Sequence, residues 1–171
     1  MLSMRENLKK RTVSSVSEAV CGQILEMEEF KKAETIFLYI AFRNEISLDR
    51  IISEALAQGK KLYIPVIQGK VMKTAEYSPE LVDGPFGTRE PAVKNFYDGN
   101  FDLTIIPAVA CDMLGGRLGF GGGYYDKFLE NKMTCKLAPI YEFQLVDELP
   151  LMPHDILMDI VVVQNKVLRF N

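Results

Sequence analysis

Histidine is almost absent from this sequence, since His154 is the only one among 171 residues. A histidine-rich metal site is therefore excluded, and a Ser-His-Asp catalytic arrangement would depend wholly on that residue. The cysteines, Cys21, Cys111 and Cys135, are odd in number and form no Cys-x-x-Cys pair. This pattern predicts reduced thiols in a cytoplasmic protein, with neither a disulfide framework nor a zinc site.

The sequence also lacks any apolar run long enough to cross a membrane, and residues 1–10 contain no signal-peptide core. Its net charge of −3 gives no basic surface for nucleic acid. Hydrophobic residues make up 48% of the chain and charged residues 25%, which is ordinary for a folded protein. We expect a single domain over residues 1–171, monomeric, with no nucleic-acid or membrane partner.

The least ordinary segment is residues 115–129, with the sequence GGRLGFGGGYYDKFL. It follows an apolar, β-branched segment at 103–110 that predicts a buried strand. The spacing of Tyr124 and Phe128 is typical of one face of a helix. A glycine-rich loop between a strand and a helix lets the backbone approach a ligand, and free N–H groups at the helix start attract an anion. Arg117 adds a forked cation suited to phosphate.

This segment matches no common nucleotide-binding motif. No Lys-Ser/Thr pair follows the glycines, as a P-loop requires, and Tyr124 stands where the dinucleotide fingerprint has its third glycine. The glycines alone would equally suit a surface turn. Because Arg117, two tyrosines and Asp126 accompany them, we favour an anion-binding loop.

Strands and helices alternate along the rest of the chain. We expect helices at 3–14, from Ser14–Ser17 to about Phe30, from Ser47 to Gly59 and from 124 to about 131. We expect strands at 35–41, 62–66, 71–77, 102–110, 137–141, 160–163 and 167–170. The strand–helix–strand order over 35–66 implies a right-handed parallel βαβ unit. The sequence thus predicts a three-layer α/β domain with a mainly parallel sheet and an irregular part at 78–100.

Three carboxylates are candidates for a ligand site, and each has a simpler interpretation. Ligands of open α/β sheets bind beyond the carboxyl ends of the strands, where Glu45 and the 115–126 loop are expected. Glu45 could instead be an acid at a helix start, and Asp126 a first-turn acid. Asp155 could form an Asx turn. As a pair, Asp126 and Asp155 would suit Mg²⁺ bound with a nucleotide.

The string G-x-R-L-G-x-G-G-G-Y-Y-D resembles the loop of the 5-formyltetrahydrofolate cyclo-ligases, also called 5,10-methenyltetrahydrofolate synthetases. The resemblance continues in residues 39–65, in the FGTREP turn at 86–91 and in residues 142–159. It covers nearly the full chain in the right order. It implies an α/β fold of the NagB/RpiA/CoA-transferase-like type.

The resemblance also implies the ligands and their residues. Magnesium would be held by Asp126 and Asp155. ATP, as co-substrate, would be bound by Arg5, Arg117, Leu118, Gly119, Phe120, Gly121, Gly122, Gly123, Tyr124 and Tyr125. The folate substrate, with or without a polyglutamate tail, would be bound by Ile40, Glu45, Phe120, Gly121, Gly122, Gly123 and Tyr124. The family's early lysine falls on Met1 here, and some members have arginine where this chain has Phe120.

The reaction that the resemblance implies is the ATP- and Mg²⁺-dependent cyclisation of 5-formyltetrahydrofolate to 5,10-methenyltetrahydrofolate, with release of ADP and phosphate. The formyl oxygen attacks the γ-phosphate, the second folate nitrogen adds, and phosphate leaves. An amide oxygen is a poor nucleophile, so the protein would supply alignment and charge neutralisation. No protein nucleophile is expected.

Two other functions are compatible with such a scaffold, because fold alone does not determine function. One is a sugar-phosphate isomerase or CoA-transferase-like enzyme, against which the Gly-Tyr-Tyr-Asp string argues. The other is a non-catalytic nucleotide- or folate-binding relative. The replacement of the early lysine by Met1 favours it, and the presence of Arg117, Asp126, Asp155 and Glu45 argues against it.

Overall fold

The computed structural model describes residues 1–152 and 155–170. Its central feature is an eight-stranded sheet with the order β13-β12-β10-β7-β1-β2-β3-β6. The strands of this sheet are β1 (Thr35–Leu38), β2 (Lys61–Gln68), β3 (Val71–Glu76), β6 (Phe96–Tyr97), β7 (Leu103–Ile105), β10 (Cys135–Pro139), β12 (Ile160–Val163) and β13 (Lys166–Arg169).

The middle of this sheet is parallel and its two edges are antiparallel. Strands β12, β10, β7, β1 and β2 each pair in parallel with the next. Antiparallel pairing then adds β3 and β6 at one edge and β13 at the other. The mainly parallel α/β sheet is therefore confirmed, as are the two predicted hairpins. Strands β2 and β7 both pair in parallel with β1 and therefore run in the same direction.

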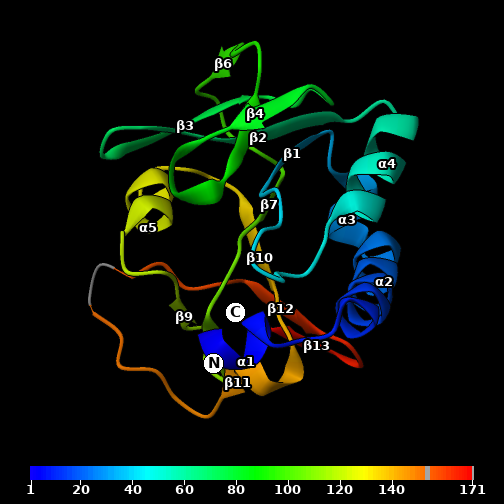
Figure 1. The fold of residues 1–171 in the computed structure, drawn as a ribbon, viewed down its shortest axis with the longest axis vertical. Helices are drawn as coiled ribbons and strands as arrows, with labels where there is room; N and C mark the ends of the chain where they lie inside the picture. Colours follow the sequence, from blue (N-terminus) through cyan, green and yellow to red (C-terminus); the bar gives the residue numbers. More distant parts are fainter. Residues whose placement is uncertain (153–154, 171) are drawn as a thin grey trace.

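Helices cover both faces of the sheet (Figure 1). Helices α2 (Lys10–Glu26), α3 (Glu28–Lys32) and α4 (Asp49–Ala57) lie on one side, where Val20, Ile24 and Ile51 join the largest buried cluster. Helix α5 (Tyr124–Leu129) lies on the other side and packs Leu129 into a second cluster. Helix α4 connects β1 to β2, which confirms the βαβ unit.

The N-terminal helix differs from the prediction. The expected helix at 3–14 is broken: α1 ends early (Leu2–Glu6), and α2 begins at Lys10. The second helix was expected to begin at Ser14–Ser17, but these serines lie inside α2, so the expected start of this helix is wrong. The Ser17 hydroxyl instead accepts a hydrogen bond from Ser47 N (2.9 Å), because the buried face of α2 packs on that segment.

The strand expected at 102–110 is also two strands. β7 ends at Ile105, and β8 (Ala110–Asp112) belongs to a separate three-stranded sheet with β9 (Arg117–Leu118) and β11 (Leu145–Val146). Pro107, which has no backbone N–H to donate to a neighbouring strand, lies between β7 and β8. The strand expected at 35–41 likewise ends at Leu38, and α5 ends at Leu129. The early endings of β1 and β7 leave irregular backbone beyond the carboxyl ends of these two central strands.

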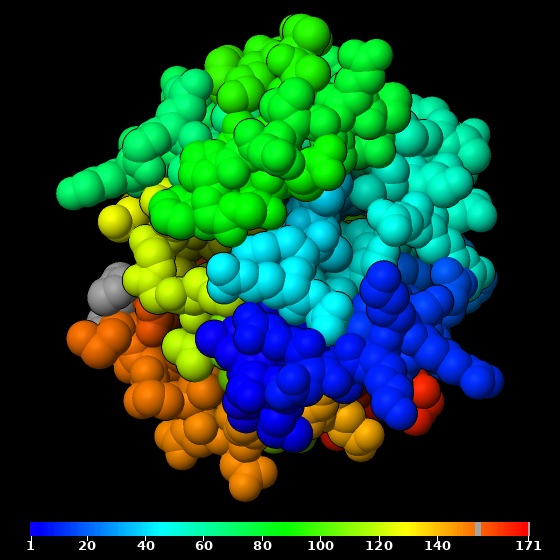
Figure 2. Space-filling model, viewed as in Figure 1, coloured from blue at the N-terminus to red at the C-terminus, as the bar shows by residue number. Residues whose placement is uncertain are grey.

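The irregular segment 78–100 contains a two-stranded hairpin, β4 (Leu81–Asp83) and β5 (Arg89–Pro91), with a short 3-10 turn at Pro85–Gly87. Figure 2 shows this segment (green), the residues after β1 (cyan) and the N-terminal residues (blue) side by side on one face. Segments far apart in sequence therefore meet there.

The three cysteines carry free thiols, as predicted. Burial raises the pKa of Cys21 and Cys135 to about 11 and that of Cys111 to about 12, so all three stay protonated near neutral pH. None of the helices in the described ranges 1–152 and 155–170 has the length and apolar character needed to cross a membrane.

Candidate functional site

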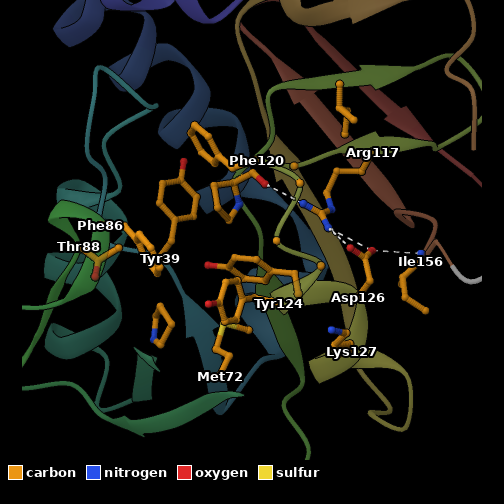
Figure 3. Close-up of a pocket in the computed structure, with 18 of the residues that line it drawn as sticks. Tyr39, Met72, Phe86, Thr88, Arg117, Phe120, Tyr124, Asp126, Lys127 and Ile156 are labelled. Carbon is orange, nitrogen blue, oxygen red and sulfur yellow. Dashed lines mark hydrogen bonds and ion pairs between the residues drawn. The ribbon is translucent and has the colours of Figure 1, made fainter. Parts of the chain in front are cut away.

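A cavity of about 1060 Å³ lies beyond the carboxyl ends of the parallel strands, where the sequence places a ligand site. Its walls come from the segment after β1, from β2 and β3, from the β4–β5 hairpin, from the 117–130 segment and from residues 149–156. In Figure 3, Tyr39, Phe86, Phe120 and Tyr124 gather at one end, whereas Arg117, Asp126 and Lys127 lie at the other. The cavity thus has an aromatic end and a charged end.

Every residue expected to bind a ligand lines this cavity, with the exception of Arg5. These residues are Ile40, Glu45, Arg117, Leu118, Gly119, Phe120, Gly121, Gly122, Gly123, Tyr124, Tyr125, Asp126 and Asp155. They come from three separate segments of the chain. His154, which the sequence singled out as the only histidine, lies outside the described residues.

The glycine loop connects β9 to α5 and bends through backbone conformations that suit glycine. Gly121 (φ 88°) and Gly123 (φ 61°) are both left-handed, and Gly123 directly precedes the first turn of α5. A Cβ atom built on Gly121 has no atom within 4 Å, so this part of the loop borders open space. Its backbone amides can therefore be approached by a ligand.

Arg117 and Asp126 bind each other at the charged end. Nη2 of Arg117 donates to Oδ1 and Oδ2 of Asp126, at 3.1 and 3.0 Å. Nη1 donates to the carbonyl of Pro107 (3.3 Å), and Asp126 Oδ1 also accepts from Ile156 N (3.3 Å). The side chain of Arg117 is only 3% exposed. The cation expected to bind phosphate is thus held by the carboxylate expected to bind metal.

Asp126 and Asp155 both line the cavity, and two carboxylates would suit a magnesium ion that arrives with a nucleotide rather than one held in a cage of protein side chains. No cluster of three or more metal-binding side chains occurs in the part of the chain that the structure describes. Magnesium commonly takes one or two carboxylates and completes its shell with phosphate oxygens and water. Each carboxylate oxygen can accept two hydrogen bonds, and Asp126 Oδ2 is given one by Arg117. Asp126 Oδ2 therefore keeps one acceptor position that could bind a hard cation such as magnesium.

The simpler interpretation of Asp126 as a first-turn acid is confirmed, because this residue lies in the first turn of α5, whereas that of Glu45 is wrong. Asp155 Oδ2 accepts from Met152 N (2.7 Å), three residues earlier in the chain. Glu45 does not begin a helix, because α4 starts at Asp49.

Glu45 is instead a buried acid at the cavity wall, with a side chain 3% exposed. Its Oε2 accepts a hydrogen bond from Phe42 N (3.2 Å), and its Oε1 lies 3.6 Å from Arg5 Nη2. Burial raises the pKa of Glu45 to about 7, although the charge of Arg5 opposes this rise. Near neutral pH this carboxyl is therefore close to its point of ionisation.

Aromatic rings form the other end of the cavity. Phe42 packs on Phe120 with ring centroids 5.7 Å apart, and Phe86 faces Tyr124 at 6.4 Å. The hydroxyl of Tyr124 donates to the carbonyl of Gly69 (3.2 Å), which fixes that ring against the β2–β3 hairpin. An apolar slot between rings is suited to a planar heterocycle.

Several lining residues were missed by sequence reasoning. The missed residues include three with cationic side chains, Arg43, Arg89 and Lys127, and one with an aromatic side chain, Phe86. Signals for them existed: Lys127 follows Asp126, and Arg43 lies at the end of the first strand segment. Arg89 and Phe86 belong to the FGTREP turn. The sequence could not show that the side chains of Phe86 and Arg89 face the cavity, because this depends on how the β4–β5 hairpin packs.

The fold and site define this protein as an α/β domain with a large cavity that suits a planar ring and an anion together. The chain belongs to the 5-formyltetrahydrofolate cyclo-ligase family, whose model matches residues 1–164.

Individual proteins that are similar to this chain carry the names used for this family. The chain is 33% identical to a 5-formyltetrahydrofolate cyclo-ligase of Haemophilus influenzae, with 93% of this chain and 91% of that protein aligned. It is 33% identical to an Escherichia coli protein of the same name, over 79% of this chain and 80% of that protein. The structure of Aquifex aeolicus 5,10-methenyltetrahydrofolate synthetase superposes with a TM-score of 0.88 at 33% identity, covering 99% of this chain and 89% of that one.

Proposed function

We propose that this protein catalyses the ATP- and Mg²⁺-dependent cyclisation of 5-formyltetrahydrofolate to 5,10-methenyltetrahydrofolate, releasing ADP and phosphate. The observation that carries the proposal is that one cavity joins an aromatic slot to a glycine loop with Arg117 and two carboxylates. A folate ring and a triphosphate need these two environments within reach of each other. Family membership supplies the substrates.

The chemistry follows from bringing two ligands together. The oxygen of the N5-formyl group attacks the γ-phosphorus of ATP, and the bond to ADP breaks. The N10 nitrogen then adds to the activated formyl carbon and loses its proton, and the C–O bond breaks to release phosphate. Both steps gain from alignment and from charge neutralisation, so no protein nucleophile is required.

Residues at the charged end are assigned to ATP. Backbone amides of Gly119, Gly121, Gly122 and Gly123 approach the phosphates, and Arg117 offsets their charge. Leu118, Phe120, Tyr124 and Tyr125 complete this wall. Asp126 and Asp155 would hold Mg²⁺, which supplies further neutralisation of phosphate charge when it is bound. Arg5 does not line the cavity, and the expectation that it contacts ATP stays a prediction.

Residues at the aromatic end are assigned to the folate. Ile40 and the rings of Phe120 and Tyr124 flank the planar ring system. Glu45 lines this end of the cavity, and its carboxylate is assigned to an N–H of the folate. The glycines at 121–123 lie between the two ends and contact both substrates.

The test is absorbance near the methenyl-folate band with purified protein, 5-formyltetrahydrofolate and Mg²⁺-ATP. We expect a rise that requires ATP and that Asp126→Ala abolishes. Asp98→Ala is the matched control, since this exposed acid pairs with Lys132 and does not line the cavity. A flat trace at high protein concentration contradicts the proposal. A panel of sugar phosphates and CoA esters would then identify an enzyme of another class.

The remaining expectations belong to the same proposal. We propose one domain over residues 1–171, a monomer acting in the cytoplasm on small molecules, with no nucleic-acid partner. Light scattering after size-exclusion chromatography measures the mass, and a single unfolding transition is expected for one domain. A dimer mass or two separate transitions would contradict these points.

A further inference from the structure

The carboxylate of Asp112 is fully buried at the end of β8 and does not line the cavity. Its Oδ1 accepts hydrogen bonds from Leu114 N (2.9 Å) and Gly116 N (2.7 Å). Its Oδ2 accepts one from Leu149 N (3.0 Å), 37 positions away in sequence. Hydrogen bonds to a carboxylate are stronger than those between neutral groups. One buried side chain thus joins the β8–β9 turn to the segment that follows β11.

Gly116 leaves the space that this carboxylate occupies. A Cβ atom built on Gly116 would lie 2.5 Å from Asp112 Oδ2 and 2.8 Å from Cδ1 of Leu151. Both distances are too short for non-bonded atoms, so the packing of Asp112 and Leu151 requires glycine at this position. Because Gly116 does not line the cavity, this packing explains a glycine of the 115–129 segment that has no contact with the ligand space.

Through Oδ1, Asp112 fixes the residue that precedes Arg117. The N–H of Gly116 donates to this oxygen, and the carbonyl of Gly116 accepts from the backbone N–H of Asp112 (3.0 Å). The next residue, Arg117, donates to both carboxylate oxygens of Asp126. One of the two proposed magnesium ligands is therefore connected to Asp112 by way of Arg117.

Through Oδ2, Asp112 fixes the beginning of the segment that carries Asp155. Strand β11 pairs with β8 so that Val146 lies opposite Asp112, and Figure 1 shows the chain after β11 (orange) running along the outside of the molecule. Leu149 N binds Asp112 there, and further along, Met152 N donates to Asp155 Oδ2 (2.7 Å). The second proposed magnesium ligand is therefore attached to a short stretch that begins at Asp112.

The far end of this segment has attachments of its own, which do not involve the buried carboxylate. Met158 N donates to the carbonyl of Gly115 (2.8 Å), and Ile156 N donates to Asp126 Oδ1 (3.3 Å). Loss of the bond to Leu149 should therefore loosen the beginning of the segment and leave β12 in place.

We propose that Asp112 is a positioning residue for the magnesium end of the site, and that its two oxygens fix Asp126 and Asp155 relative to each other. This inference rests on the proposed function, in which those two carboxylates hold Mg²⁺. Magnesium demands near-ideal octahedral geometry, so a shift of one protein ligand relative to the other weakens binding. Groups that orient metal ligands commonly contribute about tenfold to hundredfold to metal affinity.

Asp112→Asn tests the proposal because it keeps the shape of the side chain and changes one hydrogen-bonding atom. The amide oxygen can keep the bonds from Leu114 and Gly116, whereas the NH₂ group meets the N–H of Leu149, donor against donor. The probe is Mn²⁺ bound together with an ATP analogue that cannot transfer its phosphate. Electron paramagnetic resonance measures the free Mn²⁺.

For Asp112→Asn we expect Mn²⁺ affinity to fall about tenfold, because Asp155 is no longer held in place. Affinity for 5-formyltetrahydrofolate, measured by calorimetry, should stay within about twofold, since other segments form the aromatic end. An Asp112→Asn protein that binds Mn²⁺ as tightly as the wild type does would overturn the proposal.

Asp102→Asn is the matched control. Asp102 Oδ2 also accepts backbone N–H bonds, from Glu34 and Thr35 (both 2.8 Å), but this residue precedes β7, at the end of the sheet away from the cavity. We expect its replacement to leave Mn²⁺ affinity unchanged. An equal loss of Mn²⁺ affinity in both variants would indicate a general loss of structure and would overturn the positioning role.

A double-mutant cycle shows whether Asp112 acts through Asp155. In the Asp155→Asn protein, which already lacks that ligand, Asp112→Asn should change Mn²⁺ affinity by no more than about twofold. A further loss of about tenfold in that background would overturn the proposal.

Two further measurements apply if Asp112→Asn fails to fold. Gly116→Ala displaces the same carboxylate and should weaken Mn²⁺ binding in the same way. In the wild type, the amide hydrogen of Leu149 should exchange slowly with solvent, and fast exchange there would overturn the proposal. A folded wild type that binds no Mn²⁺ together with the ATP analogue would overturn the proposed function instead.

Discussion

Arg117, which is buried, and Asp126, which is partly exposed, form an ion pair at the charged end of the cavity, with one guanidinium nitrogen 3.1 and 3.0 Å from the two carboxylate oxygens. The pair links β9 to the first turn of α5. Removing one partner leaves the other charge buried without compensation, which is far more costly than losing an exposed pair.

Asp126→Asn should therefore destabilise the ligand-free protein by about 3 kcal/mol, because Arg117 keeps its charge but loses its partner. Urea unfolding followed by circular dichroism measures this change. Asp98→Asn removes an exposed acid and should leave the unfolding midpoint unchanged. Equal midpoints for the two variants would show that the Arg117–Asp126 pair does not form in solution.

Chelation of divalent cations by EDTA should abolish the ATP-dependent rise in absorbance, and added Mg²⁺ should restore it. In Asp155→Asn, we expect half-restoration to require about tenfold more Mg²⁺, because one of two carboxylate ligands is lost. The titration is read as product formed against free Mg²⁺. Identical titration curves for this variant and the wild type would show that Asp155 is not a magnesium ligand.

Glu45 should make stability depend on pH. Its pKa is about 7 in the folded protein against an ordinary value of 4.5, so the folded state holds its proton to higher pH than the unfolded chain. The contribution of Glu45 is thus full below pH 4.5 and is lost as pH rises through 7.

Glu45→Gln lacks this titration. The stability of the wild type relative to this variant should fall by about 3 kcal/mol between acidic and mildly alkaline pH, as the shift in pKa requires. Urea midpoints at a series of pH values measure the difference. A difference that grows with pH would mean that the charged form of Glu45 is the stabilised one.

Phe86 should contribute to ligand binding and little to stability, because its side chain is 68% exposed while it lines the cavity. Phe86→Ala should raise the KM for folate about fivefold, as expected for loss of one ring contact. Val93→Ala is the matched control, since Val93 is also 68% exposed but is not part of the cavity wall.

A second change at this position tests the backbone. Phe86 has a φ of 62°, which is unfavourable for any residue with a Cβ. Phe86→Gly should therefore bind folate as weakly as Phe86→Ala and yet unfold at a higher temperature. Full folate affinity in both variants would exclude Phe86 from the binding surface.

Gly119 should be sensitive to alanine for a local reason. A Cβ atom there would lie 2.9 Å from Nη1 of Arg117 and would displace the guanidinium. We expect Gly119→Ala to weaken nucleotide binding about tenfold. Gly59→Ala is the control: Gly59 has a φ of 72° far from the cavity, so it should lose about 1 kcal/mol of stability from backbone strain and keep its affinity. If Gly119→Ala binds nucleotide as tightly as the wild type does, this account of Gly119 is contradicted.

The sequence by itself determined most of the succession of elements and the segments that form the cavity wall. Buried strands are continuous apolar runs, and the string at 115–129 has its glycines, arginine and aspartate next to one another. These are local signals, so the βαβ unit, the two hairpins and the glycine loop before α5 could be predicted. The NagB/RpiA-like label for the fold stays a prediction.

Only the tertiary structure decided which of these side chains bind one another. Arg5 meets Glu45 across 40 positions of sequence, and Phe86 faces Tyr124 because the β4–β5 hairpin packs over the glycine loop. The break between α1 and α2 and the split of the 102–110 segment also depend on packing. Pairing of charges and rings is determined by distances between elements, and the local pattern of residues carries no record of those distances.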